Sequence, residues 1–545
     1  GGSVGKVMAD IDGVDRSDRF EGINAPVVAQ GDIRYVNIGE GVLPSGSGDV
    51  GGGGIYAVGN IDVVENQGIG SHIRGDIVAS GAIGTISLEN GAIINADILT
   101  ILDFAGSRET VGAWLTEEDP VDPIEIPEEE IGRIAISGEG GILGSLFAAR
   151  DIGDITVRHG FGMLNSYLQV FGADATLGNV VSDGYGVREV ALIGGANMGN
   201  LIATGRGEIL QTGNFTDGVR FGESQDFDPY FGLPTFLPLI ELAPAVAPAG
   251  DQAGIIDEFT VLFGRDMGVV DAYQLMNSNP FDGPSVLEIA NSIRGIQTHG
   301  ATAPGKASMT GGIDITTGRL GYFRPDADVL STAVTVAGPI NYAHIPGDFA
   351  GGSVMHAAGP NGDIGFFRVD GDLVGNVRAD GRLGTLMIGE DLQGNVTVDG
   401  IGVRGNALGF MNLGGNMLSG SFDINGNVGV IRTAGSLGVA GAGQTAASEM
   451  LINGNLSVLQ VGTGRAANQE NAQLALDVLV EGDLNVLSVD GRITGDIEVG
   501  GRLLSARISA DSETGTNADP NPTLSLGNLL NGGTTSFDVR ALAAT

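Results

Sequence analysis

The sequence predicts an all-β protein, a parallel β-helix (β-solenoid) with rungs of about 19 residues, interrupted by loops and by one larger insertion that contains a short helix. Three observations predict it. Glycine-led units repeat along the chain, apolar and polar residues alternate within each unit, and the 545 residues include 94 glycines but only 19 prolines. The chain is also 42% apolar, too hydrophobic for a disordered chain and too irregular for collagen.

Two kinds of unit alternate, most clearly between Gly362 and Ala510. The nine-residue unit has the pattern G-x-[LIV]-x-x-[apolar]-x-[VI]-x and opens at Gly362, Gly381, Gly482 and Gly501. The ten-residue unit adds one residue, usually around a second glycine, and opens at Gly371, Glu390 and Gly491. One unit of each kind gives a period of about 19 residues, which fits one coil with two sides.

Each unit contains a predicted strand. In GRLGTLMIG, Leu386 and Ile388 are predicted to point inward with Leu383 as a third anchor, while Thr385 and Met387 point outward. The same alternation makes anchors of Val396 and Leu487, beside outward-facing Thr397 and Ser488. Stacking successive coils roughly 4.8 Å apart would pair their backbones and form one apolar column.

Glycines and charges complete the predicted coil. The glycine that opens each unit is expected at a corner with positive φ, and a second glycine (Gly375, Gly394 or Gly495) at a bulge. Residues 19 apart should stack, which places Asp363 by Arg382 and Asp483 by Arg502. Asp372 and Asp391 would stack as like charges, and two interpretations stay open for them: a cation site or two solvated carboxylates.

The repeat divides the chain into three ranges. Residues 1–204 are predicted to form the N-terminal part of the solenoid with long loops, including the acidic segment from Glu117 to Glu130. Residues 205–312 are predicted to be a non-repetitive insertion or subdomain, and residues 313–545 the C-terminal part of the solenoid. Within the insertion, Pro284 is followed by apolar residues at helical spacing, which predicts the short helix: Val286, Ile289, Ala290 and Ile293.

Charge and composition restrict the possible partners. The formal net charge is −39 with a pI near 4.2, which disfavours nucleic acid. No apolar run is long enough to span a membrane, and no cysteine is present for a disulfide scaffold or a thiolate metal site. The chain begins at Gly1 without a signal-peptide pattern, so we expect a processed product or a segment of a longer chain.

The G-[DNR]-[LIV] repeats with alternating strand residues resemble those of large secreted bacterial β-solenoids, the filamentous-haemagglutinin and autotransporter-passenger type of surface protein. The resemblance covers about three fifths of the chain. It implies export and an extracellular or bacterial cell-surface location. It leaves function open, because such solenoids include adhesins, surface-layer components, fibres and polysaccharide-active enzymes.

Candidate sites for chemistry are few. Asp10, Asp12, Asp15 and Asp18, with Gly13, have spacings similar to a calcium loop but lack its terminal glutamate, so they are the candidate metal ligands and calcium the candidate ion. A calcium-binding RTX roll is not expected, because Leu487 stands where that repeat requires aspartate. Asp226 and Asp228 near Arg220 form the one paired-carboxylate candidate, and a nearby aromatic cluster is either local core or an interface: Phe227, Tyr230, Phe231, Phe236 and Leu237.

Three short motifs are explained by the repeat itself. The tripeptide Arg74-Gly75-Asp76 contains the repeat's own Gly-Asp-Ile, and sequons at Asn395 and Asn455 fall inside repeat units. The five histidines are scattered without ligand spacing, and no cofactor is expected.

The leading hypothesis is a non-enzymatic, extracellular structural protein that self-associates into a surface layer, fibre or filament through solenoid ends and inserted loops. The alternative is an adhesin or a carbohydrate-binding or carbohydrate-active β-helix protein, with a surface glycan as its partner.

Overall fold

The computed structural model is composed of β-strands joined by turns and loops, and no helix occurs among the residues that it describes. Those residues are 2–8, 26–38, 41–42, 54–66, 72–89, 91–100, 129–138, 140–158, 160, 162–182, 186–203, 255–279, 283–299, 307–400, 405–438, 449–463, 472–493, 495–508, 526–527 and 536–538. The chain forms two compact units: unit 1 contains Gly1–Asn279 and Ser285–Ala290, and unit 2 contains Pro280–Pro284 and Asn291–Thr545.

Unit 1 has two parallel sheets, called sheet A and sheet B. Sheet A contains β1 (Val7–Met8), β3 (Val36–Ile38), β6 (Ile61–Asn66), β9 (Ile83–Glu89), β12 (Glu130–Ser137), β15 (Asp151–Ile152), β16 (Ile155–Val157), β18 (Thr176–Leu177), β19 (Val180–Ser182), β21 (Asn197–Met198), β22 (Leu201–Ala203) and β24 (Asp266–Ala272). Sheet B contains β2 (Val27–Ala29), β4 (Gly41–Val42), β5 (Ile55–Ala57), β7 (His72–Ile73), β8 (Ile77–Ala79), β10 (Ile93–Ile94), β11 (Asp97–Thr100), β13 (Gly141–Leu143), β14 (Leu146–Ala149), β17 (Gly162–Val170), β20 (Gly186–Gly194), β23 (Ile255–Phe263), β25 (Gln274–Met276) and β26 (Ser285–Ile289).

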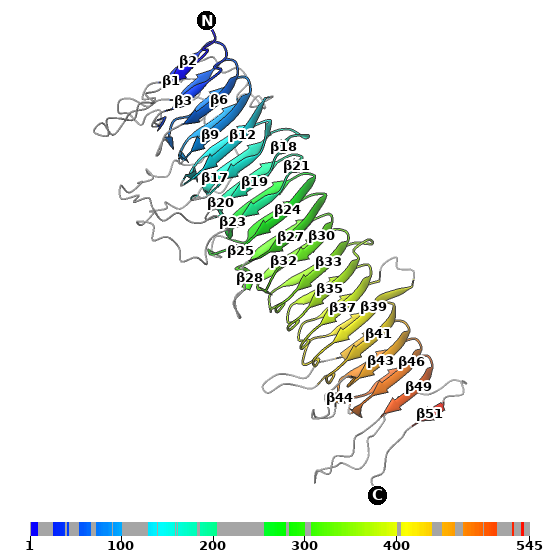
Figure 1. Ribbon diagram of the computed structural model, residues 1–545. Helices are drawn as coiled ribbons and strands as arrows, with labels where there is room; N and C mark the ends of the chain where they lie inside the picture. Colours follow the sequence, from blue (N-terminus) through cyan, green and yellow to red (C-terminus); the bar gives the residue numbers. More distant parts are fainter. Residues whose placement is uncertain are drawn as a thin grey trace. The chain divides into compact units, whose positions relative to one another are not determined.

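Unit 2 repeats this arrangement, and its strands follow one another coil after coil in Figure 1. Its sheet A contains β27 (Ser292–Thr298), β30 (Leu320–Arg324), β33 (Ile340–Ile345), β35 (Ile364–Val369), β37 (Leu383–Ile388), β39 (Asn406–Leu413), β41 (Asn427–Thr433), β43 (Leu456–Val461), β46 (Leu484–Val489), β49 (Leu503–Ile508) and β51 (Ser536–Asp538). Its sheet B contains β28 (Ala307–Thr310), β29 (Ile313–Thr317), β31 (Asp328–Val329), β32 (Thr332–Val336), β34 (Val354–Ala357), β36 (Asn376–Ala379), β38 (Val396–Val398), β40 (Phe422–Ile424), β42 (Glu449–Ile452), β45 (Asp477–Val480), β48 (Ile497–Val499) and β50 (Leu526–Gly527). The strands β44 (Ala472–Leu474) and β47 (Gly491–Ile493) form a separate parallel pair.

Each coil contributes strands to both sheets, and parallel neighbours pair across successive coils, as a parallel β-helix requires. The predicted period is present where β35 pairs with β37 (Ile364 opposite Leu383) and where β46 pairs with β49 (Leu484 opposite Leu503). Other coils are longer because loops enter them, as where β43 pairs with β46 (Leu456 opposite Leu484). The fold class is therefore the predicted one, with a coil length that varies.

The interior is formed by one face of every strand. Leu386, Val396 and Leu487 are all 0% exposed, as predicted for inward anchors. Thr385, Thr397 and Ser488, beside them, are partly exposed and face outward. The period-2 alternation therefore assigns the faces correctly at these positions.

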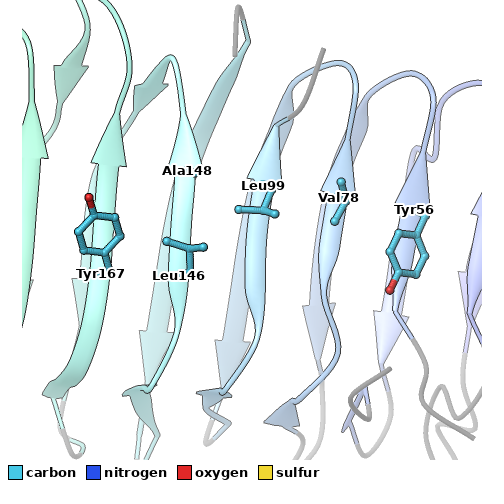
Figure 2. Close-up of a cluster of buried hydrophobic side chains, with 6 residues drawn as sticks. All are labelled: Tyr56, Val78, Leu99, Leu146, Ala148 and Tyr167. Atoms are coloured by element: carbon cyan, nitrogen blue, oxygen red, sulfur yellow. The ribbon is translucent and has the colours of Figure 1, made fainter. Parts of the chain in front are cut away.

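Several strands of sheet B in unit 1, among them β5, β8 and β14, are apolar and buried on both faces. Tyr56 lies between Ile55 and Ala57, and all three are buried. Because neighbouring side chains alternate, Tyr56 faces away from the coil interior and begins a second cluster. Figure 2 shows this outer row on successive strands: Tyr56, Val78, Leu99, Leu146, Ala148 and Tyr167. Continuous apolar runs such as Ile55–Ala57 are typical of strands buried on both faces.

The predicted short helix is wrong. The residues after Pro284 form β26, in which Ser285, Leu287 and Ile289 are buried while Val286 and Glu288 are more exposed. This is the period of a strand, and Leu287 breaks the helical spacing. The predicted insertion from 205 to 312 also contains strands β23 to β28 wherever it is described, and the two compact units divide between residues 279 and 291.

The predicted role of the unit-opening glycines also needs correction. Gly371 and Gly381 do not have positive φ; of the glycines that open a unit, only Gly491 does (149°). A Cβ at Gly381 would overlap Oδ1 of Asp363 in the preceding coil, and a Cβ at Gly371 would overlap Oδ1 of Asp348. Glycine is required at these positions because successive coils approach each other closely.

Candidate functional site

The residues predicted to carry chemistry lie mostly outside the described part of the chain. This holds for the calcium candidates Asp10, Asp12, Asp15 and Asp18, for Asp226 and Asp228 with Arg220, and for the aromatic cluster from Phe227 to Leu237. Within the described ranges, no three or more histidine, aspartate or glutamate side chains are grouped so as to hold a metal ion. The described residues also include no helix capable of crossing a bilayer.

The most extended polar feature of unit 2 is a ladder of side-chain oxygens along one corner of the coils. In each step, a side chain accepts a hydrogen bond from a backbone N–H in the next coil: Asp328 from Asp348 (2.8 Å), Asp348 from Asp372 (2.7 Å), Asp372 from Asp391 (2.8 Å), Asp391 from Asn416 (2.6 Å), Asn416 from Ser436 (2.8 Å) and Ser436 from Gln473 (2.9 Å). We call this series the corner ladder. The carboxylate of Asp372 therefore binds the peptide backbone of the next coil, a contact that the two interpretations of Asp372 and Asp391 did not include; both interpretations stay predictions.

The other predicted stacked pairs form similar contacts. Asp363 Oδ1 accepts from the backbone N–H of Arg382 at 2.6 Å. Asp483 binds the backbone N–H of Arg502 (2.8 Å) and also its guanidinium (2.8 Å), and these hydrogen bonds lower the pKa of the exposed Asp483 carboxyl. The prediction that Asp483 stacks on Arg502 is confirmed.

Both sequon asparagines accept a hydrogen bond from the backbone of the next coil, at positions outside the corner ladder, as expected for residues of the repeat. Asn395 Oδ1 accepts from the backbone N–H of Ser421 (2.9 Å), and Asn455 Oδ1 accepts from that of Asp483 (2.7 Å). In unit 1, Asp76 of the Arg-Gly-Asp tripeptide accepts from the backbone N–H of Asp97 (3.2 Å).

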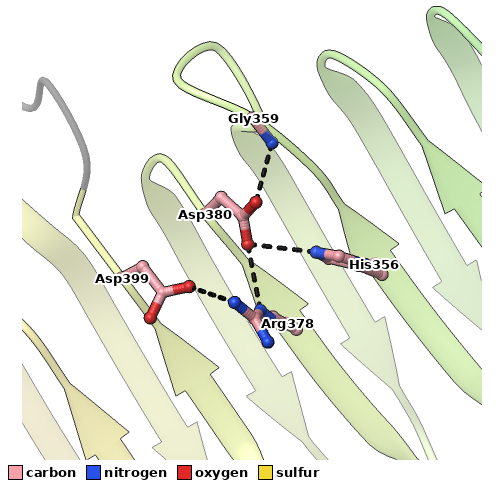
Figure 3. A network of polar contacts seen from close by, with 5 residues as sticks. All are labelled: His356, Gly359, Arg378, Asp380 and Asp399. Carbon is pink, nitrogen blue, oxygen red and sulfur yellow. Dashed lines mark hydrogen bonds and ion pairs between the residues drawn. The ribbon is translucent and has the colours of Figure 1, made fainter.

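A charged network lies across three neighbouring strands of sheet B in unit 2, as Figure 3 shows. Asp380 follows β36 and accepts hydrogen bonds from Arg378 Nε (3.0 Å) and from the backbone N–H of Gly359 (2.7 Å), and it contacts His356 Nε2 at 3.0 Å. Arg378 also reaches Asp399, at the end of β38, with Nη2 at 2.7 Å. The network therefore links β34, β36 and β38.

A second, smaller network with the same histidine–aspartate–arginine contacts lies on sheet A. His344 Nε2 is 3.0 Å from Asp370, and Arg368 Nε pairs with the same carboxylate. Both networks place an arginine two residues before the aspartate at the end of a strand, and a histidine on the preceding strand. Each connects adjacent coils at the surface.

The electrostatics of these networks favour a structural role. Burial alone would raise the pKa of Asp380, but hydrogen bonds from Gly359, His356 and Arg378 outweigh it and lower the pKa to about 2. A general acid needs a pKa near the operating pH, so an aspartate this acidic does not suit that role. Among the described residues, no hydroxyl group hydrogen-bonds to His356 or His344.

Two carboxyl groups in unit 1 have pKa values shifted toward neutrality. Burial, together with the nearby Asp76 carboxylate, raises the pKa of Asp97 to about 7. Burial and the carboxylates of Glu258 and Asp257 raise the pKa of Glu189 to about 7. Asp97 is on the same strand and face as Leu99 of the buried outer cluster, and it is itself partly exposed.

The two charged networks were not predicted from the sequence. Their signal is the recurrence of Arg-x-Asp at 368–370 and 378–380, one repeat unit apart at strand ends. The histidine partners lie 24 and 26 residues before the aspartates, beyond the predicted period.

Comparison of the chain with protein-family models, with curated proteins and with solved structures gave no significant match, so the parallel β-helix is established here by the chain's own strand pairing.

Proposed function

We propose that the chain is an extracellular structural protein that self-associates into a surface layer, fibre or filament. The corner ladder is the observation that supports this most. Its polar side chains hydrogen-bond one coil to the next, and the two charged networks do the same at the surface. Side chains committed to neighbouring coils stabilise a long solenoid and are not available to a substrate.

Exposed apolar side chains are the candidate contacts between copies. Four large apolar residues of the described chain are more than a third exposed: Met8 (48%) and Val28 (46%) in unit 1, and Leu330 (37%) and Leu504 (46%) in unit 2. Parallel strands also carry unpaired backbone groups wherever a neighbour is missing, and these favour association.

Sedimentation velocity and negative-stain microscopy over a range of protein concentrations, with and without calcium, test self-association. We expect association that increases with protein concentration. Either the double variant Met8→Thr/Val28→Thr or the double variant Leu330→Thr/Leu504→Thr should weaken it. The variant that weakens association shows which of the two pairs of side chains makes the contact. Compact monomers at every concentration would count against self-association, and an unchanged response in both variants would exclude these contacts.

A carbohydrate-active enzyme is the competing class. Incubation with a panel of acidic polysaccharides and analysis of the products by mass spectrometry tests it. Release of shorter chains or unsaturated sugars by the purified protein would contradict a purely structural role.

A further inference from the structure

One face of unit 2 differs in charge from the rest of the chain. The chain contains 66 acidic and 27 basic residues, yet the ten sheet A strands from β27 to β49 contain no aspartate or glutamate. The same strands include five arginines: Arg294, Arg324, Arg368, Arg432 and Arg507. Sheet B of the same unit, by contrast, includes acidic residues in six of its strands.

Most of these arginines share one outward column. Strand pairing continues from His344 and Arg368 through Met387, Asn412, Arg432, Gln460 and Ser488 to Arg507. Arg324 precedes His344 in this column, next to Phe323, which pairs with Ala343. Arg324 and Arg432 are exposed, and neither forms an ion pair with another described residue, whereas Arg368 is paired with Asp370.

An aromatic and apolar column runs beside the arginines. It passes from Tyr322 through Tyr342, Phe366, Thr385 and Phe410 to Val430, Val458 and Val486, all of which are partly exposed. The rings of Tyr342 and Phe366 stack with centroids 5.2 Å apart and an interplanar angle of 5°. Their faces therefore point along the column, and their edges form an apolar ridge toward solvent.

Glycines keep the face flat on the other side of this ridge. The outward positions immediately before four of the ridge residues are Gly321, Gly365, Gly384 and Gly409. A Cβ at Gly384 would overlap the carbonyl oxygen of Gly365, so these positions cannot carry larger side chains without moving the backbone. The result is an apolar ridge from β30 to β46, with glycines beside it on β30, β35, β37 and β39 and a neighbouring column that carries arginines on β30, β35, β41 and β49.

We propose that this face binds a linear polysaccharide that carries carboxylate groups, such as a polyuronate. Guanidinium groups pair with carboxylates in a planar, bidentate geometry. Neighbouring strands repeat at roughly 5 Å, and an extended chain of pyranose rings advances by a similar distance per sugar. A regular polymer aligned with the coils can therefore place some of its carboxylates at the arginines, which occur on every second or third strand of this column, and its sugar rings along the ridge.

Other polyanions fit this face less well. Single-stranded nucleic acid binds by stacking its bases on exposed ring faces, and the faces of Tyr342 and Phe366 are turned toward each other. A second copy of the chain would bring its own net charge of −39 to the contact, and its acidic groups lack the regular spacing of a polymer.

Isothermal titration calorimetry with polygalacturonate oligomers that are long enough to span the ten strands tests the proposal. We expect binding that weakens with added salt and is absent for the fully methyl-esterified oligomer of equal length. The variant Arg324→Gln/Arg432→Gln should bind at least about tenfold more weakly. The control Arg150→Gln/Arg265→Gln, which removes two exposed arginines of unit 1, should stay within about twofold of the wild type.

Three outcomes would overturn the proposal: no binding, equal binding of the methyl ester, or equal loss in the two arginine variants. Equal or tighter binding of an oligothymidylate of the same charge would assign the face to nucleic acid instead. The proposal is independent of self-association, because the sedimentation experiment is performed without ligand, and either result leaves the titration interpretable.

Discussion

Asp372 Oδ1 accepts a hydrogen bond from the backbone N–H of Asp391 across 2.8 Å, although both side chains are carboxylates. Burial raises the pKa of Asp372, this hydrogen bond lowers it, and the neighbouring carboxylates of Asp348 and Asp391 raise it further, with a net upward shift. The hydrogen bond itself therefore favours the ionised carboxylate, whereas burial and the neighbouring carboxylates disfavour it.

Replacement of Asp372 separates these two effects. Asp372→Asn keeps an acceptor oxygen and removes the repulsion, so we expect a melting temperature at pH 7 equal to or above that of the wild type. Asp372→Ala leaves the N–H of Asp391 without its acceptor and should reduce the free energy of unfolding by about 1–3 kcal/mol. Hydrogen exchange at the Asp391 amide should be faster in the alanine variant only. Equal exchange in both variants would contradict the role of the ladder.

The assignment of faces is tested at two adjacent residues. Leu487 is 0% exposed and pairs with Leu459 and Ala506 in the interior, so Leu487→Asp should cost on the order of 3–5 kcal/mol. Ser488 faces outward beside Arg507, and Ser488→Asp should be nearly neutral. Thermal melts that shift equally in the two variants would contradict the assignment.

The network around Asp380 should stabilise unit 2 in a pH-dependent way. The pKa of Asp380 in the folded protein is about 2, below the ordinary value of about 3.9. The stabilisation is therefore complete above about pH 4 and is lost as the pH falls toward 2. Asp380→Asn should reduce the free energy of unfolding by about 1–3 kcal/mol at pH 7 and by less at pH 3.

Asp423→Asn is the matched control for this variant. Asp423 faces outward from the same sheet, opposite Thr397, and is not part of the network. Chemical denaturation at both pH values should show little change in this control, and a loss as large as that of Asp380→Asn would show that the network contributes nothing specific.

His72 predicts pH sensitivity in the same direction in unit 1, over a higher pH range. Burial, and secondarily Arg74, lowers the pKa of His72 to about 4, and its Nδ1 accepts from the backbone N–H of Ala92 at 3.1 Å. The unfolded chain takes up a proton below about pH 6.5 and the folded chain only below about pH 4, so stability falls as the pH drops through this range. His72→Asn should remove this slope, as measured by hydrogen exchange at the Ala92 amide. An unchanged slope would mean that His72 does not cause it.

Asp97 should make the stability of unit 1 depend on pH in the direction opposite to that of His72, over nearly the same pH range. Its pKa of about 7 lies above its ordinary value, so the folded chain holds a proton that the unfolded chain releases, and stability falls as the pH rises from about 4 to 7. Asp97→Asn should be more stable than the wild type at pH 8, by an amount on the order of 1–3 kcal/mol, because it removes a buried charge beside Asp76. Comparison of unfolding at pH 5 and pH 8 measures the effect, and equal stability of the two proteins at pH 8 would contradict it.

Local sequence patterns predicted the parts of the fold that depend on short-range alternation. The inward anchors Leu386 and Leu487 and the stacking of Asp483 on Arg502 all lie in coils of the shortest length. Residues 286–293 were misassigned because an apolar residue at every third or fourth position fits a helix, while the burial of Leu287 shows only in the structure.

The outer faces could not be predicted because coil length varies. Tyr322, Tyr342 and Phe366 share one column, but the interval between the second and the third is longer than that between the first and the second. A search of the sequence at one fixed period does not align these three residues. The arginines of the neighbouring column are also separated by unequal numbers of residues, so the same search does not align them either. Only the pairing of strands across loops of unequal length brings these side chains together.

The corner ladder has a direction. Asp348 accepts from Asp372, and Asp372 accepts from Asp391, so each acceptor belongs to the earlier coil and each donor to the later one. A coil that has already formed therefore offers ready acceptors to the stretch of chain that emerges after it. Growth of unit 2 from its N-terminal side would add one templated turn at a time, so that the order of synthesis on the ribosome matches the order of folding.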